Sequence, residues 1–500
     1  MRGITKRFPA VVANEDVDFE AAAGEVHALL GENGAGKTTL SNILTGLYRP
    51  DDGEIRLWGE SVEFHSPRDA LDAGVAMVHQ HFRLVPPFTV AENVVLGDHR
   101  DIGRTFLLQP RAIERRVEEL SLRYGLAVEP RARIWQLSLG EQQRVEILKA
   151  LYKDARILIL DEPTAVLTPQ EAKALFGTIR AMADDGRTVI FISHKLHEVK
   201  AVADRVTILR RGRSVATLPA AEATPRSLAA LMVGREIELG RHNGHRDVGE
   251  ACLELEGVGV DGDRGLLAVK DVSLTVRRGE IVAVAGVAGN GQRELAETVA
   301  GMRGPTTGTI RVAGRKLKGG DAREAIGAGV AYVPEDRLGT GLAPGLSVAD
   351  NVVLKSYRKP PASRGPLLLV RRIRALAESV MERYDVRASG PDVPARQLSG
   401  GNLQKVVLAR EFSGEPIVLV AASPTRGLDV AGIEVVHSYL RDAAERGVGV
   451  LLLSEDLDEI RALADRIAVM YEGGIVGERD AESATVEELG LLMAGGEAQQ

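Results

Sequence analysis

The chain repeats itself at a nearly constant spacing, and an internal repeat restricts the possible folds more than any single motif does. Glycine-rich turns begin at Gly31 and Gly286, which are 255 residues apart. The tetrapeptides Leu-Ser-Leu-Gly at Ser138 and Leu-Ser-Gly-Gly at Ser399 are 261 residues apart. The spacing of 261 also separates three further pairs: Pro163 and Pro424, Asp204 and Asp465, and Met232 and Met493. Because the matches keep their register, we predict a duplicated domain, with copies at 1–240 and 241–500.

Within each copy, short apolar runs alternate with longer helical patterns, which predicts an α/β fold. Ile157–Leu160 and Thr188–Ile192 are almost continuously apolar. Such runs are typical of parallel strands that are covered on both faces. Leu84–Leu137 carries helical charge patterning instead, and we interpret it as a helical subdomain inserted before the next strand. The junction between the copies is the short polar segment Gly240–Asp247.

The two copies differ at their beginnings. The second copy opens with an apolar strand pattern, Cys252–Val258, that starts before the position equivalent to Met1. We therefore expect the first copy to have a shortened edge, or the true start of the chain to lie upstream of Met1.

Composition excludes several classes of function. A net charge of −7 argues against a dedicated nucleic-acid binder. The only cysteine, Cys252, excludes an intramolecular disulfide and a cysteine-rich zinc site. No apolar run approaches the ~18 residues of a membrane span, and Met1–Phe8 lacks the apolar core of a signal peptide. We therefore expect any contact with a membrane to be made through a partner.

The turn at Gly31 has the pattern Gly-x4-Gly-Lys-Thr between a strand pattern, Val26–Leu30, and a helical one. Glycines let backbone N–H groups surround phosphates, and the helix N-terminus adds partial positive charge. Lys37 would reach the β- and γ-phosphates, and the Thr38 hydroxyl would ligate Mg²⁺. The alternative, a glycine-rich turn with an exposed lysine, is disfavoured by this context. The predicted ATP-binding residues are Gly31, Glu32, Asn33, Gly34, Ala35, Gly36, Lys37, Thr38 and Thr39.

Two carboxylates follow the apolar run Ile157–Leu160. The carboxyl ends of parallel strands are where α/β sheets hold ligands. We predict that Asp161 binds Mg²⁺ through water and that Glu162 orients and deprotonates the attacking water. In isolation, a solvated turn before Pro163 would explain these residues equally well, and the glycine-rich loop upstream favours the catalytic interpretation.

Three further residues are candidates because of their positions. His194 ends an apolar run and would contact the γ-phosphate and the attacking water, although a strand-end histidine is usually structural. Gln80 ends another strand and would sense the metal and the water. Phe8 would stack on adenine, an interaction worth ~1–3 kcal/mol, with packing in the core as the alternative.

The segment at Ser138 opens a predicted helix, since serine is a good N-cap and the helix N-terminus can hold a phosphate. The second copy has Ser399, Gly400, Gly401 and Asn402 at the corresponding place.

A phosphate loop, a strand-end glutamine, Leu-Ser-Gly-Gly, Asp-Glu-Pro and a histidine resemble the ATPase subunit of an ABC transporter. Their counterparts recur in this order in both copies, with some members altered in each. The resemblance covers nearly the whole chain and implies two tandem P-loop nucleotide-binding domains, each with an antiparallel β portion, using ATP and Mg²⁺. The tandem arrangement is similar to importers of monosaccharides and nucleosides. Gly286–Leu295, Pro334–Arg337 and Pro424–Asp429 are closer to the nucleoside branch, because the sugar branch usually has arginine at the place of Gln292.

The resemblance also implies partners and a location. Two transmembrane permease subunits would dock near Gln80 and Glu335, and an extracytoplasmic substrate-binding lipoprotein would deliver the cargo. The chain would lie at the cytoplasmic face of the cell membrane as a peripheral protein, with no nucleic-acid partner. In this family each ATP lies between one loop and the other copy's Leu-Ser-Gly-Gly, so Ser399–Asn402 would complete the ATP site of the first copy.

The second copy lacks the groups that hydrolysis needs. Its replacements are Gln292 for Lys37, Arg293 for Thr38, Ala422 for Asp161, Ser423 for Glu162, Glu455 for His194 and Glu335 for Gln80. We call the Leu-Ser-Gly-Gly segment and its counterpart the signatures. The signature of the first copy is altered, since Leu139 adds bulk beside Ser138. It also has Thr168 where the second copy keeps Asp429. We therefore predict one hydrolytic site and one silent site, which would still bind nucleotide through its glycines.

Other functions are less well supported. A soluble ABC protein acting on ribosomes would usually keep both catalytic sets and a long charged linker between them. DNA repair is disfavoured by the acidic balance and the missing zinc cysteines. The cargo stays open between nucleosides and monosaccharides such as ribose, galactosides or xylose.

Overall fold

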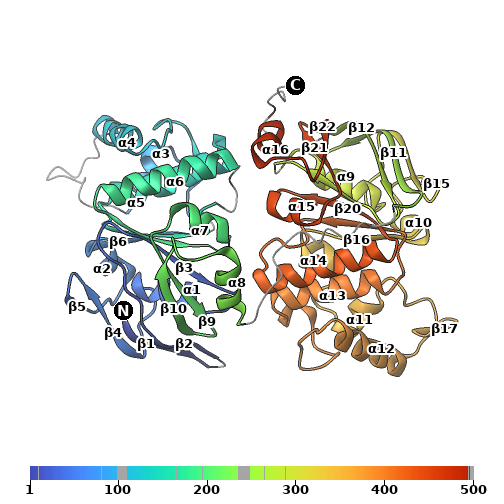
Figure 1. Ribbon diagram of the computed structural model, residues 1–500, viewed down its shortest axis with the longest axis horizontal. Helices are drawn as coiled ribbons and strands as arrows, with labels where there is room; N and C mark the ends of the chain where they lie inside the picture. The colour runs from blue at the N-terminus through green and yellow to red at the C-terminus, as the bar shows by residue number, and fades with distance from the viewer. Residues whose placement is uncertain are drawn as a thin grey trace. The chain divides into compact units, whose positions relative to one another are not determined.

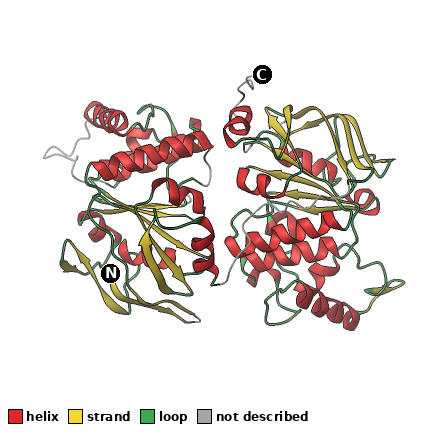
Figure 2. Cartoon of the chain, in the orientation of Figure 1, coloured by secondary structure: helices red, strands yellow, loops and turns green. Residues whose placement is uncertain are grey.

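The computed structural model describes residues 1–9, 11–79, 82–97, 110–164, 167, 169–193, 195–234, 248–263, 265–287, 289–493 and 495. The chain forms two compact units, Met1–Glu238 and Leu239–Gln500 (Figure 1). In each unit, helices cover a central sheet on both faces (Figure 2). The predicted residues Gln80, His194 and Thr168 lie outside the described residues.

The first unit is built on a six-stranded sheet with a helical subdomain and a smaller antiparallel sheet. The main sheet has the order β10 (Arg213–Pro219), β9 (Arg205–Arg210), β3 (Val26–Gly31), β8 (Thr188–Ile192), β7 (Ile157–Asp161) and β6 (Val75–Val78), in which only β10 runs antiparallel to its neighbour. The smaller sheet has the order β2 (Val11–Val17), β1 (Arg2–Phe8), β4 (Asp52–Leu57) and β5 (Glu60–Val62). The helices are α1 (Lys37–Leu44), α2 (Pro67–Asp72), α3 (Val90–Val95), α4 (Pro110–Tyr124), α5 (Leu139–Tyr152), α6 (Pro169–Asp184), α7 (Leu196–Val202) and α8 (Pro225–Val233), with a 3₁₀ turn at Ile134–Gln136.

The second unit repeats this architecture. Its main sheet has the order β16 (Val330–Val333), β19 (Val418–Ala422), β20 (Gly449–Ser454), β13 (Ile281–Ala285), β21 (Arg466–Tyr471) and β22 (Gly474–Asp480), and its smaller sheet the order β12 (Leu267–Arg277), β11 (Ala251–Asp261), β14 (Thr307–Val312) and β15 (Arg315–Lys316). A short hairpin joins β17 (Ser363–Arg364) to β18 (Leu367–Leu368). The helices are α9 (Gln292–Val299), α10 (Ala322–Gly327), α11 (Val348–Val353), α12 (Val370–Arg383), α13 (Gly400–Phe412), α14 (Val430–Glu445), α15 (Leu457–Leu463) and α16 (Val486–Met493), with a π-helical turn at Arg337–Gly341 and a 3₁₀ turn at Ala395–Gln397.

The predicted α/β class and the inserted helical subdomain are confirmed. In the first unit α3, α4 and α5 follow β6 and pack on one another before the chain enters β7. Strand β13 shows why the apolar runs are continuous. Ile281, Ala283 and Ala285 face one buried cluster, while Val282 and Val284 face the other. None of the described helices has both the length and the apolar character that crossing a bilayer requires.

A buried glutamate ties the ends of two core strands together in each unit. In the first unit Glu198 accepts hydrogen bonds from the hydroxyls of Thr164 (2.6 Å) and Ser193 (2.9 Å). In the second, Glu459 accepts from Thr425 (2.7 Å) and Ser454 (2.6 Å). Each carboxylate therefore fixes the turn after β7 or β19 to the carboxyl end of β8 or β20.

We predict that Glu459→Ala destabilises the second unit, because it leaves two buried hydroxyls without their acceptor. An unsatisfied buried polar group costs about 1–3 kcal/mol, so the free energy of unfolding should fall by roughly 2–4 kcal/mol in denaturant titrations. Glu445→Ala, at an exposed position at the end of α14, is the control and should stay within about 0.5 kcal/mol. Equal effects of the two substitutions would contradict the bridging role.

Candidate functional site

The glycine-rich loop joins β3 to α1, as the sequence predicts. Gly36 caps the helix in the left-handed region, with φ of 101°. A Cβ there would lie 2.5 Å from the carbonyl oxygen of Ala13, so only glycine can occupy the position. The β1–β2 hairpin also donates a hydrogen bond from Asn14 Nδ2 to the Gly36 carbonyl, at 3.3 Å. The loop is thereby held against a neighbouring sheet and not only by its own helix.

Lys37 is the first residue of α1, and its side chain is buried within the loop. Its Nζ donates to the carbonyl oxygens of Gly31 (2.7 Å) and Glu32 (3.0 Å). The ammonium is thus held in the concave face of the loop, where a phosphate would be surrounded by backbone N–H groups. Thr38, next in the chain, is exposed at the first turn of the helix.

Asp161 lies on the same sheet edge as this loop. It ends β7 and is in register with Ile192 of β8, which is itself in register with Leu29 of β3. Burial and, to a smaller extent, the charge of Glu162 raise the pKa of Asp161 to about 6, against the positive charge of Lys37, which lowers it. The three predicted groups Lys37, Asp161 and Glu162 therefore interact electrostatically at the carboxyl edge of the sheet.

Glu162 has an unusual backbone conformation, with a φ of 47°. Its N–H donates to the carbonyl of Ile192 at 2.9 Å. Ser423, its counterpart in the second unit, has a φ of 40° and donates to Leu453 at 2.7 Å. Because the unit without the carboxylate keeps the same conformation, the positive φ belongs to the turn and not to the chemistry of Glu162.

These residues fit ATP and Mg²⁺. The loop offers N–H groups and one buried cation to phosphate oxygens. Hydroxyl and carboxylate oxygens are the ligands that Mg²⁺ prefers, usually one or two from protein with the rest from phosphates and water. Thr38 and Asp161 are of this type.

Gln80 and His194 fall outside the described residues, so their roles stay predictions. Their neighbours are described. Ser193, directly before His194, is held by Glu198. His79, directly before Gln80, has a pKa lowered by burial and by the charges of Arg83 and Lys149.

Phe8 lies at the end of β1 and is half-buried. Its ring packs edge-on against Tyr48, with ring centroids 5.5 Å apart, and Lys6 Nζ lies 5.9 Å from its centroid. Stacking on adenine stays a prediction. The partner Tyr48 could not be recognised from the sequence, because it lies forty positions along the chain and has no motif of its own.

The two Leu-Ser segments differ more than their sequences suggest. Ser138 is the N-cap of α5, and its backbone N–H and its hydroxyl both donate to the carboxylate of Glu141, each at 2.8 Å. These bonds lower the pKa of Glu141. A negative charge thus already lies at this helix N-terminus, where a phosphate would otherwise be attracted.

The corresponding end of α13 carries no such charge. Asn402 replaces the glutamate, and its Nδ2 donates to Ser399 Oγ at 2.9 Å while its Oδ1 accepts from Arg387 N–H at 2.8 Å. Ser399 makes no side-chain capping bond to its own helix. The second signature therefore has no acidic residue in the first turn of its helix, and the first presents a carboxylate there.

The loop of the second unit has the same capping conformation, with φ of 101° at Gly291, but lacks the lysine and the threonine. Gln292 is buried at the place of Lys37, and no described residue forms a hydrogen bond with its Nε2. Arg293, at the place of Thr38, forms an ion pair with Glu297 at 2.8 Å. Ala422 ends β19 where Asp161 ends β7.

Two motifs of the second unit that are far apart in sequence contact one another. Glu335 forms an ion pair with Arg426, and Arg337 donates to the Arg426 carbonyl and to Gln404 Oε1, the latter at 2.7 Å. The strand-end position that would be glutamine in a complete unit is thus bound within the fold.

A family model described as ABC transporter matches residues 14–165 and 269–426, which include both loops and both strand-end turns. The chain belongs to the ABC transporter family. ATP-binding proteins of this family are ATPases, so the chain is an ABC-type ATPase, as the resemblance predicts.

Curated relatives match this ABC-type ATPase over almost its whole length. The glucose import ATP-binding protein TsgD13 of Haloferax volcanii is 48% identical over 99% of the chain and 95% of its own length. The nucleoside import ATP-binding protein NupA of Lactococcus lactis is 45% identical over 99% of the chain and 98% of its own length. The guanosine import ATP-binding protein NupO of Bacillus subtilis is 45% identical over 99% of the chain and 97% of its own length.

Among solved structures, the archaeal ribosome recycling factor aABCE1, in complex with the ribosomal stalk protein aP1, has a TM-score of 0.65 and 20% identity. The match covers 96% of the chain and 90% of that chain. This likeness shows the fold alone.

We predict that Asp161→Asn stabilises the metal-free and nucleotide-free protein in a pH-dependent way. The folded-state pKa of about 6 lies above the ordinary value for an aspartate, so the carboxylate costs stability as pH rises through this window. The variant should melt about 2–4 °C above the parent near pH 8 and gain less near pH 5. Its Mg²⁺-dependent hydrolysis should fall by ~10–100-fold.

Asp184→Asn, at an exposed position at the end of α6, is the matched control and should show no pH-dependent gain. A gain of the same size at both pH values would show that the charge of Asp161 is not the destabilising element.

Proposed function

We propose that the chain is the ATP-hydrolysing subunit of a nucleoside importer, with one competent ATP site. The observation that carries the proposal is that Lys37, Asp161 and Glu162 interact at one sheet edge of the first unit. The second unit has Gln292, Ala422 and Ser423 at these places. We assign the complete domain to 1–240 and the incomplete domain to 241–500.

The residues of the first unit then have distinct roles. The loop Gly31–Gly36 and the Lys37 ammonium bind the phosphates, and Thr38 and Asp161 hold Mg²⁺. The metal, when bound, neutralises charge on the phosphate oxygens. Glu162 accepts a proton from the attacking water, a contribution of typically 10²–10⁴-fold in rate. Gln80 would sense the metal and the attacking water, His194 would contact this water and the γ-phosphate, and Phe8 would stack on the adenine.

The signature segments support the asymmetry. We propose that the ATP held by Lys37 is contacted during hydrolysis by Ser399–Asn402, whose helix has no acidic residue in its first turn. The opposite combination would place the Glu141 carboxylate near the loop that has Gln292 instead of lysine. Negative charge at that helix end would repel a phosphate, which disfavours a second productive site.

A groove of about 220 Å³ beside His79 supports the proposal that the chain has permease partners. Its apolar lining includes Leu47, which is 47% exposed, and Leu71 and Met77. Basic side chains border it: Arg83, Lys149 and Lys153. We propose that one of two transmembrane permease subunits docks a cytoplasmic segment here. The chain would then lie at the cytoplasmic face of the membrane as a peripheral protein, and an extracytoplasmic binding protein would deliver the cargo.

Nucleosides are the proposed cargo because of the second loop. It has Gln292 where the sugar branch of the family usually has arginine. Identity alone does not decide, since the named relatives include a glucose, a guanosine and a ribose import protein at 48%, 45% and 44%. The monosaccharide alternative therefore remains the second candidate.

We predict that Ser399→Arg and Ser138→Arg differ sharply in the assembled transporter. Arginine at position 399 blocks the contact with the γ-phosphate of the one competent site, so the ATPase rate should fall to the level of Glu162→Gln. Arginine at position 138 faces a loop that already lacks its lysine, so substantial hydrolysis should remain. Equal loss in both variants would mean that the second site controls turnover, and greater loss from Ser138→Arg would reverse the pairing of loops and signatures.

The cargo can be tested in proteoliposomes that contain the chain with its permease and binding protein. We predict that guanosine and other nucleosides stimulate the ATPase rate and accumulate in the vesicles, whereas ribose and glucose do neither. The Glu162→Gln variant, with the same cargo, sets the background. Stimulation by the sugars alone would replace nucleosides with monosaccharides while leaving the ATPase assignment intact.

A further inference from the structure

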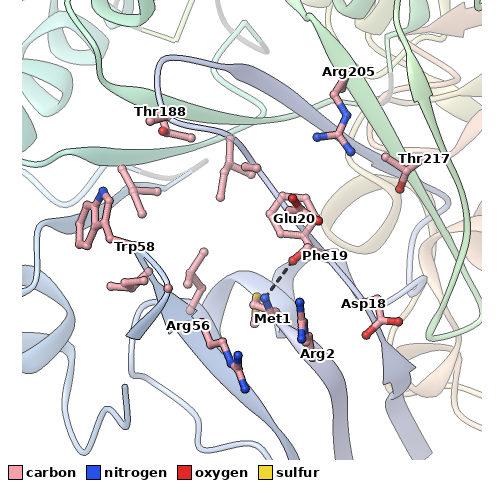
Figure 3. Close-up of a pocket in the computed structure, with 17 residues that line it drawn as sticks. Met1, Arg2, Asp18, Phe19, Glu20, Arg56, Trp58, Thr188, Arg205 and Thr217 are labelled. Atoms are coloured by element: carbon pink, nitrogen blue, oxygen red, sulfur yellow. Dashed lines mark hydrogen bonds between the residues drawn. The ribbon is translucent and has the colours of Figure 1, made fainter. Parts of the chain in front are cut away.

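Each unit carries its phosphate loop at the carboxyl edge of the core sheet, where α/β folds hold ligands. The groove in Figure 3 lies at the opposite edge of the first unit, because Thr188 and Arg205 beside it are the first residues of β8 and β9. The loop of the second unit, Gly286–Gly291, leads from β13 into α9 at the carboxyl edge. A ligand of the second unit is therefore expected at this loop.

The second loop is held in shape by neighbouring segments. Gly291 is the N-cap of α9, and a Cβ there would lie 2.3 Å from the carbonyl oxygen of Ala268. Asn290 Nδ2 donates to the Met470 carbonyl at 3.4 Å, and its Oδ1 accepts from the N–H of Glu472 at 3.1 Å. The backbone N–H groups at the start of α9 are thus arranged as in turns that bind phosphate.

A buried donor in this loop lacks an acceptor. Gln292 is 9% exposed, and in the described part of the chain its Nε2 has no hydrogen-bond partner. The amide lies against the first glycine of the loop, since a Cβ on Gly286 would lie 2.7 Å from Nε2. Lys37 Nζ takes the corresponding place in the first unit, where it donates to the Gly31 carbonyl. A buried donor without an acceptor costs stability, and a phosphate oxygen at this place would supply the acceptor.

The two positions assigned to Mg²⁺ in the first unit do not fit the metal in the second. Ala422 ends β19 where Asp161 ends β7, so no carboxylate is present at this place. Arg293 replaces Thr38 and forms an ion pair with Glu297 at 2.8 Å. Because Mg²⁺ prefers oxygen ligands, a methyl group and a guanidinium cannot replace the carboxylate and the hydroxyl. Phosphates at the second loop would be held by N–H groups alone.

The same edge is unfavourable for a third phosphate. Ser454, the last residue of β20, is in register with Ala285, directly before the loop. Glu455 follows it and is exposed, at the place of His194 in the first unit. A γ-phosphate would add negative charge beside this carboxylate, and the neutral Gln292 cannot offset that charge as a lysine would. Two phosphates, in contrast, need only the N–H groups of the loop and the amide.

We propose that the second loop is a binding site for a nucleoside diphosphate, which it holds without Mg²⁺ and in preference to the triphosphate. The Gln292 amide donates to the β-phosphate, which the N–H groups of the loop surround. This inference rests on the proposed function, in which the second unit does not hydrolyse ATP, and it gives that unit a ligand of its own.

The test uses the full chain with Lys37→Ala, which weakens the first site, and measures ADP and ATP binding by equilibrium dialysis. In EDTA, ADP should bind at about one per chain and at least ~10-fold more tightly than ATP, because of the charge repulsion. Mg²⁺ should change the Kd for ADP by less than ~3-fold. Tighter binding of ATP than of ADP, or ADP binding that requires Mg²⁺, would overturn the proposal.

Two substitutions at position 292 locate the site. Gln292→Met has a similar length without the N–H donors, so ADP affinity should fall by ~10-fold or more. Gln292→Lys restores an ammonium and should raise the affinity for ATP relative to ADP, which a purely structural role of the amide does not predict. Unchanged ADP binding in Gln292→Met would place the nucleotide elsewhere and refute the assignment.

The carboxylate is tested in the same background. Glu455→Gln should tighten ATP binding by ~3–10-fold and leave ADP binding within ~2-fold. Glu445→Gln, at an exposed position at the end of α14, is the matched control and should change neither. Equal effects of the two substitutions would contradict the role of Glu455. The proposed function fails separately, if the parent chain in the assembled transporter hydrolyses no ATP.

Discussion

Burial of the parallel strands on both faces is the constraint on which both units depend. Ile281–Ala285 alternates between two apolar clusters, so no polar group can be accommodated along the strand. Most charged and hydrogen-bonding side chains of these sheets are therefore found at the strand ends and the turns that follow; within the strands, His27 and Thr207 of the first unit are buried as a hydrogen-bonded pair, 2.8 Å apart. The phosphate loop and the carboxylates of the first unit share one such edge because parallel strands end together.

Comparison of the two units separates the structural features that both share from the side chains that only the first unit has. The positive φ occurs at both Glu162 and Ser423, and a buried glutamate fixes the same turn in both units. Both features persist in the second unit, where Gln292 and Ala422 replace Lys37 and Asp161. They therefore serve the packing of the sheet edge, and this frame forms with or without the groups that we propose to be catalytic.

The sequence predicts the features that depend on local pattern. Continuous apolar runs and the repeat predict the α/β class, and the glycine spacing predicts the loop. The predicted loop lysine and strand-end carboxylates lie close enough to interact in the structure. Pairings between distant segments are not encoded in any local pattern. The Glu335–Arg426 ion pair joins residues on separate motifs, and Phe8 packs on Tyr48. The Glu141 cap has a recognisable spacing after Ser138, but its effect on the charge of the helix end becomes evident only beside Asn402.

The two ion pairs of Glu297 would make the proposed inactivity of the second loop difficult to reverse. Glu297 is buried and is held by Arg293 on one side and Arg303 on the other. A single change that restored a hydroxyl at position 293 would remove one of these cations before it restored any metal binding. The lysine and both carboxylates would still be missing. A sequence with only this change would thus lose an ion pair without regaining hydrolysis. The asymmetry between the two units would therefore be difficult to reverse by single substitutions.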